Sequence, residues 1–173
     1  MKKFLKQLIK TIIFILFIFL LAIIQVTFVN RYNLLGATPN LVLIGLMANI
    51  FSPNFLMVIL GLIVGGMIYD FSGLFNFISL SSFLLTIIIF RFLGKKYILK
   101  KHLFLNFLFG ILGTIIYNFF YILLNYFFSQ ANFFQYFFSL SHLVEIGINA
   151  LGVFIFCLIA ELFSLLKSSI FKK

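Results

Sequence analysis

Long apolar runs separated by short basic or polar stretches constrain the fold of this chain more than any other feature. Apolar runs near 20 residues can cross a hydrocarbon core about 30 Å thick, and several of them fit within the 173 residues. Hydrophobic residues make up 64% of the chain and charged residues only 9%, which is outside the usual composition of a soluble domain. The loops are too short to hold a separate domain. We therefore predict one all-α integral membrane domain over residues 1–173.

The distribution of positive charge decides between two classes of partner. A net charge of +10 would fit nucleic-acid binding if the basic residues covered one surface. Apart from Arg31, they instead gather before the first apolar run, at 91–101 and at 167–173. Clustering at alternate loops is the positive-inside pattern of membrane proteins. It predicts that both termini are cytoplasmic, that the clusters meet anionic lipid, and that the chain does not bind nucleic acid.

The same clusters predict how many times the chain crosses the membrane. With the N-terminus inside, four crossings return the chain to the cytoplasm at 91–101. The predicted bundle of six helices therefore spans roughly 11–29, 40–52, 54–71, 75–93, 103–128 and 142–166. The second segment is short because Pro39 and Pro53 limit its extension. Whether this segment crosses the membrane or forms a re-entrant pair with the third stays open at this point.

The stretch from Pro39 to Gly73 carries the strongest packing signal. Gly61 and Gly65 lie one helical turn apart, and Gly66 and Asp70 repeat that spacing on the neighbouring stripe. Small residues at this spacing let two helix backbones approach closely in lipid. We expect this face to pack against another helix, either within the chain or in a partner.

The carboxylate of Asp70 is unusual in an apolar helix, because a carboxylate at mid-bilayer costs about 2.5–3.5 kcal/mol of insertion free energy. Its presence therefore calls for an explanation. In the six-span topology Asp70 lies at the outer end of the third helix, where Arg31 is the only basic residue. An ion pair between Arg31 and Asp70 is one hypothesis. The other is that Asp70 reaches interfacial water and ends the helix.

The last helix begins with His142 and Glu145 and continues with Asn149 on the same face. A metal site would need a third ligand, and the other histidine, His102, is predicted on the opposite side. We expect Glu145 to act as an anion near a helix N-terminus, and Asn149 to bond to another helix. The chain shows no phosphate-binding loop, nucleophile elbow or cysteine pair, so no catalytic, cofactor or metal residue is predicted.

The loop at 129–141 is uncharged and carries phenylalanines at helical spacing. It could lie flat on the membrane as an interfacial helix. An unstructured aromatic loop fits the same residues.

Several motifs together resemble the rod shape-determining protein MreD family. They are Thr38-Pro39-Asn40-Leu41 opening a short second helix, Gly61-x-x-x-Gly65, Tyr69-Asp70-Phe71-Ser72-Gly73, and a last helix with a central Asn149 before a basic tail. One departure stands out. The family usually places a further glycine a few residues past the Ser-Gly, where this chain reads Leu74-Phe75-Asn76-Phe77.

The resemblance implies a non-enzymatic subunit of the bacterial cell-elongation complex, located in the cytoplasmic (inner) membrane. The implied partners are MreC, the actin-like MreB, RodA and a class B penicillin-binding transpeptidase. The glycine-rich helix face would dock a transmembrane helix of a partner such as MreC, although internal packing of the same face explains the glycines equally well. The residues assigned to helix packing or docking are Pro39, Asn40, Gly61, Gly65, Gly66, Asp70, Gly73 and Asn149.

A second class of protein also fits a small six-helix bundle with small-residue faces. It is the substrate-binding S subunit of an energy-coupling-factor vitamin transporter. Such a binder should enclose a cavity with polar groups that converge from several helices and outer loops. The sequence offers asparagines and tyrosines but no evident ligand cradle.

Overall fold

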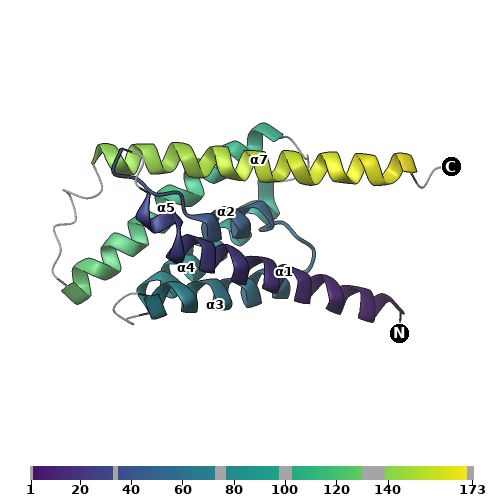
Figure 1. Ribbon diagram of the computed structural model, residues 1–173, viewed down its shortest axis with the longest axis horizontal. Helices are drawn as coiled ribbons and strands as arrows, with labels where there is room; N and C mark the ends of the chain where they lie inside the picture. Colours follow the sequence, from purple (N-terminus) through teal and green to yellow (C-terminus); the bar gives the residue numbers. More distant parts are fainter. Residues whose placement is uncertain (1, 33–34, 73–76, 98–102, 130–138, 171–173) are drawn as a thin grey trace.

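The computed structural model describes residues 2–32, 35–72, 77–97, 103–129 and 139–170, and all of its regular structure there is helical (Figure 1). The predicted all-α fold class, with about six helices, is confirmed. A 3₁₀ turn, η1, covers Val29–Arg31. The helices are α1 (Lys2–Thr27), α2 (Leu41–Ala48), α3 (Phe55–Ser72), α4 (Ile78–Tyr97), α5 (Leu103–Ser129) and α7 (Leu140–Ile170). Gly73 and the phenylalanines at 133–138 lie outside the described residues.

Four of these helices, α1, α3, α5 and α7, are long and apolar enough to cross a membrane, and α4 contains a shorter apolar stretch, Ile78–Leu93. Their outward faces carry large apolar side chains, such as Leu16 at 60% and Phe92 at 82% exposure. Soluble monomers rarely expose so much contiguous apolar surface. The chain is therefore a helical membrane protein.

Successive helices run in opposite directions, as contacts at the two ends of the bundle show. At one end, Asp70 near the end of α3 bonds to the start of α4, and Asn118 of α5 bonds to the first turn of α7. At the other end, Arg91 of α4 lies over the ring of Phe55 at the start of α3, 4.9 Å from its centroid. Both chain termini lie at this second end (Figure 1), which we call the terminal end; the first is the distal end.

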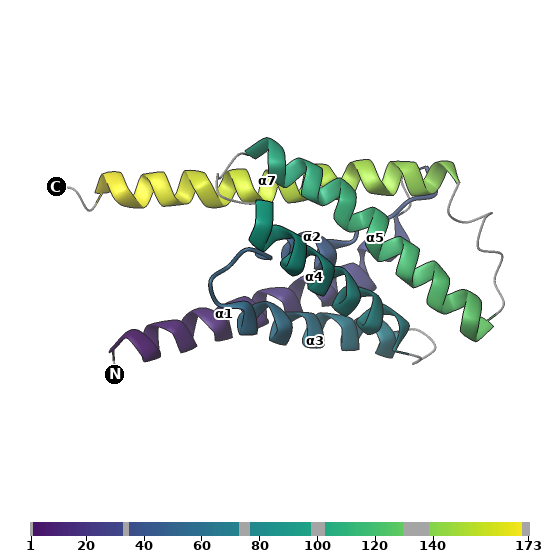
Figure 2. The ribbon, with the colours of Figure 1, turned by 180° about the vertical axis from the view of Figure 1, so that it is seen from behind.

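The short helix α2 lies at the centre of the bundle, against α1, α3, α5 and α7, with α4 and α5 in front of it when the molecule is seen from behind (Figure 2). Its side chains are buried all round, including Val42, Leu43, Ile44, Leu46 and Met47. A helix that is apolar on every face is typical of an element enclosed by other helices. In this protein the surrounding helices shield α2 from lipid.

The second segment runs from the distal end to the terminal end. It starts where Gln25 of α1 accepts the backbone N–H of Leu41, and it ends where Asn54 donates to the hydroxyl of Thr11. Gln25 and Thr11 are separated by about 21 Å along α1 at ~1.5 Å per residue. Residues 49–54 add an irregular connection to α2. Irregular backbone at membrane depth is tolerated where protein encloses it, which is the case for the buried Ile50.

Candidate functional site

The glycine groove of α3 is filled by other parts of the same chain. A Cβ atom added at Gly61 would lie 2.7 Å from the ring of Phe14 on α1, and one at Gly65 would lie 2.6 Å from Val42 on α2. At Gly66 it would lie 2.9 Å from the Cα of Leu80 on α4. Three helices therefore use these glycines for close packing. In this structure the groove has no room for a helix from a partner.

Asp70 caps α4 and does not pair with Arg31. The carboxylate is 4% exposed, and its two oxygens accept the backbone N–H groups of Ser79 and Leu80, each at 3.0 Å. These N–H groups in the first turn of α4 have no partner within their own helix, and the helix dipole favours an anion there. The ion pair between Arg31 and Asp70 is absent from the described residues, because the helix N-terminus already satisfies the carboxylate.

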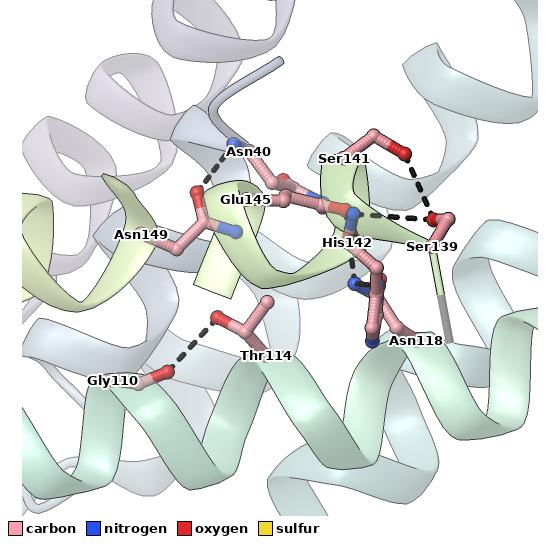
Figure 3. Close-up of polar contacts among 9 residues, drawn as sticks. All are labelled: Asn40, Gly110, Thr114, Asn118, Ser139, Ser141, His142, Glu145 and Asn149. Atoms are coloured by element: carbon pink, nitrogen blue, oxygen red, sulfur yellow. Dashed lines mark hydrogen bonds and ion pairs between the residues drawn. The ribbon is translucent and has the colours of Figure 1, made fainter. Parts of the chain in front are cut away.

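A network of buried amides joins α1, α2, α3 and α7 at the distal end. Asn40 caps α2 by accepting the N–H of Leu43 at 3.0 Å, and its own backbone N–H donates to the side-chain oxygen of Asn149 at 2.7 Å (Figure 3). The hydroxyl of Tyr69 also donates to the Asn40 side chain, at 3.3 Å. Asn149 thus bonds to another helix, as expected from the sequence. Its Nδ2 has no hydrogen-bond partner among the described residues.

A second polar cluster connects α5 to the first turns of α7. The side-chain nitrogen of Asn118 donates to the Glu145 carboxylate at 3.0 Å and lies 3.0 Å from Nδ1 of His142. Nδ1 of His142 lies 3.8 Å from Oε2 of Glu145. Figure 3 shows the three side chains converging between the two helices. The described residues contain no group of three His, Cys, Asp or Glu side chains suited to a metal.

A polar cavity of about 260 Å³ opens between these two clusters. Its walls come from α1, η1, residues 36–40, α3, α5 and the start of α7, so six parts of the chain converge on it. The turn at Leu35 and Gly36, with φ of 54° and 81°, brings the chain over the start of α2. The polar side chains in the walls include Gln25, Asn40, Tyr69, Tyr117, Asn118 and Glu145.

The charge of the cavity wall is one-sided. Glu145 is the only carboxylate and His142 the only histidine among the described lining residues, and none of these residues is a lysine or arginine. A second cavity, of about 660 Å³, lies at the terminal end beside Lys6, Lys10 and Asn54. The two cavities therefore differ in the charged side chains that line them, a carboxylate in the first and lysines in the second.

In the structure, the predicted site residues fall into two groups, those at the cavity and those that hold helices together. Pro39 and Asn40 line the cavity and Asn149 lies beside it, whereas the α3 glycines and Asp70 hold helices together away from its walls. The residues not predicted as part of a site are Gln25, Tyr69, Tyr117, Asn118, His142 and Glu145. Each is a polar residue within an apolar helix, and such residues tend to face the interior of a bundle. The presence of a polar residue in an apolar helix does not, however, indicate which of these residues line the same cavity.

Comparison with known proteins provides no further guide to this site. The chain matches no protein-family model, no curated protein and no solved structure.

Proposed function

We propose that this chain is a non-enzymatic membrane subunit of the bacterial cell-elongation complex, which builds the lateral peptidoglycan wall. The observation that carries the proposal is that motif residues far apart in the sequence meet in the fold. Asn40 forms hydrogen bonds with both Asn149 and Tyr69, and Asp70, which follows Tyr69 in the sequence, caps α4. Residues that matched the family's motifs by chance would not need to contact one another. Residues that define a shared fold would be expected to do so.

The proposed partner contacts lie on the outward faces of the long helices. The α3 groove is occupied by Phe14 and Val42, so an MreC transmembrane helix would dock on exposed apolar surface instead. RodA, the class B transpeptidase and MreB would join the same assembly. The lysines near the second cavity, Lys6 and Lys10, would meet anionic lipid on the cytoplasmic side of the inner membrane.

Site-specific photocrosslinking tests the docking proposal helix by helix. A photoreactive residue is placed at one exposed, apolar position on each long helix, and the chain is co-expressed with the MreC-like protein of its own genome. We expect crosslinks to MreC from one or two adjacent helices only. The positions are Leu20 on α1, Met67 on α3, Ile88 on α4, Leu112 on α5 and Ile155 on α7, all exposed in the monomer.

Leu62 provides the matched control because it lies on α3 but is fully buried. Crosslinks from Met67 without crosslinks from Leu62 would locate a partner on the outer face of α3. Failure of all five exposed positions to crosslink, with both proteins present in the membrane, would argue against membership of the elongation complex.

The polar cavity favours a second candidate, the S subunit of an energy-coupling-factor vitamin transporter. A cavity whose polar groups come from four α-helices, from η1 and from a loop is the feature expected of a solute binder. Its volume is slightly below the ~300–1,000 Å³ typical of ligand sites. Affinity purification separates the two candidates, because the second requires a membrane coupling subunit with its ATPases in place of the MreC-like protein.

A further inference from the structure

The distal cavity contains a carboxylate, that of Glu145, which pairs with no lysine or arginine of the described residues. Glu145 lies in its wall with its side chain 23% exposed. In the described part of the chain, no lysine or arginine approaches this carboxylate within 4.0 Å, and its Oε1 atom makes no hydrogen bond. A carboxylate at this position in a helical membrane protein normally has a partner.

His142 makes no direct hydrogen bond to this carboxylate, because Asn118 lies between them. The side-chain nitrogen of Asn118 donates to Glu145 Oε2 at 3.0 Å and lies 3.0 Å from His142 Nδ1. The ring and the carboxylate are 3.8 Å apart at their nearest atoms, which is beyond hydrogen-bond distance.

The size and walls of the cavity indicate which kind of ligand fits beside Glu145. A volume of about 260 Å³ equals roughly nine water molecules at ~30 Å³ each, far more than one inorganic ion needs. Tyr69, Tyr117 and Tyr121 also line the cavity. Aromatic rings attract organic cations, and amides and hydroxyls can bond to their polar substituents.

We propose that the distal cavity is a binding site for a small organic cation, whose positive group lies against Glu145. This site goes beyond partner docking and would serve a subunit of the elongation complex as a ligand sensor. If the chain is instead the S subunit of a vitamin transporter, the proposal means that the transported solute is an organic cation. Crosslinking to an MreC-like protein does not involve the cavity, so failure of docking and failure of ligand binding are distinguishable.

An isosteric pair of probes tests the charge requirement. Choline and 3,3-dimethyl-1-butanol have the same shape and hydroxyl group, and they differ only in the positive nitrogen. Each is titrated into the purified full chain in lipid nanodiscs, and binding is measured by calorimetry and by the shift in melting temperature. We expect choline to bind at least about tenfold more tightly than the neutral alcohol. Sodium chloride at matched ionic strength is not expected to raise the melting temperature.

Two substitutions on α7 complete the experiment. Glu145→Gln keeps the shape and removes the charge, so the preference for choline should fall to about equal binding. Glu161→Gln removes an acid further along the same helix, outside the cavity lining, and should leave the preference unchanged. The proposal would be overturned if both probes bound equally well, or if choline did not bind at millimolar concentration. It would also be overturned if Glu145→Gln kept the preference for choline, or if sodium chloride raised the melting temperature as much as choline does.

Discussion

The side-chain oxygen of Asn149, in α7, accepts the backbone N–H of Asn40 at the start of α2, 2.7 Å away and 109 residues earlier in the chain. Both residues are at least 95% buried. A buried backbone donor that loses its partner costs about 1–3 kcal/mol. This one bond therefore fixes the start of the central helix against the last helix of the bundle.

Replacing Asn149 by leucine should lower the free energy of unfolding by about 1–3 kcal/mol, because the N–H of Asn40 would then be buried without an acceptor. Thermal unfolding of the purified protein in detergent, followed by circular dichroism, measures the change. The control is Thr27→Val, since Thr27 donates to the backbone oxygen of Ile23 on its own helix at an exposed position. Equal melting temperatures for the two variants would contradict the role of Asn149.

Asp70→Ala should destabilise the protein by about 1–2 kcal/mol, because two N–H groups of α4 lose the carboxylate that caps them. Asp70→Asn keeps one acceptor and should lose less. Arg31→Ala should stay within about 0.5 kcal/mol of the parent, as expected for an exposed residue without a structural role. Rescue of Asp70→Arg by Arg31→Asp in a stability assay would restore the ion-pair hypothesis.

Two glycine-to-alanine changes should differ clearly in their effect on stability. At Gly66 the new methyl group would lie 2.9 Å from the Cα of Leu80, a backbone atom that cannot move aside, and overpacking of this kind costs about 1–3 kcal/mol. At Gly147 nothing lies within 4 Å of the new atom, so alanine should be neutral or slightly stabilising, by up to about 1 kcal/mol. Melting temperatures of the two variants provide the comparison. A fall of similar size in both would show that internal packing does not explain Gly66.

Phe77 adopts the left-handed backbone conformation, with φ of 54°, immediately before α4 begins. Glycine adopts this conformation freely, whereas other residues pay about 1–2 kcal/mol. Phe77→Gly should therefore be more stable than Phe77→Ala by about that amount, since both variants lose the same ring. Chemical denaturation of the two variants tests the order, and a more stable alanine variant would contradict it.

The alternating directions of the helices predict that both chain termini lie on one side of the membrane, and the positive-inside pattern predicts that this side is cytoplasmic. A Cys157→Ser background allows single cysteines to be introduced at Leu5 and Phe163 near the terminal end and at Arg31 near the distal end. A membrane-impermeant thiol reagent added to intact cells should label only the Arg31 variant. Labelling of Leu5 or Phe163 without cell lysis would reverse or break the predicted topology.

Much of the fold followed from local patterns in the sequence. Apolar runs and their breaks predicted an all-helical class, because a helix satisfies its backbone hydrogen bonds within one segment in lipid. The spacing of Gly61 and Gly65 indicated close packing without naming the partner, which proved to be α1 and α2 of the same chain. Asn149 was recognised as a residue that bonds to another helix. Each of these expectations depended on the chemistry of a single segment.

The sequence by itself thus determined a basic, apolar chain of helices with a few polar residues that must face inward. Tertiary structure alone decided that Asp70 caps α4 and does not pair with Arg31, because that choice depended on the position of another helix N-terminus. It also decided that Asn118 and Glu145 share a cavity with Gln25 and Tyr69. The side chains in that wall come from helices far apart in the chain, so their convergence depends on long-range packing.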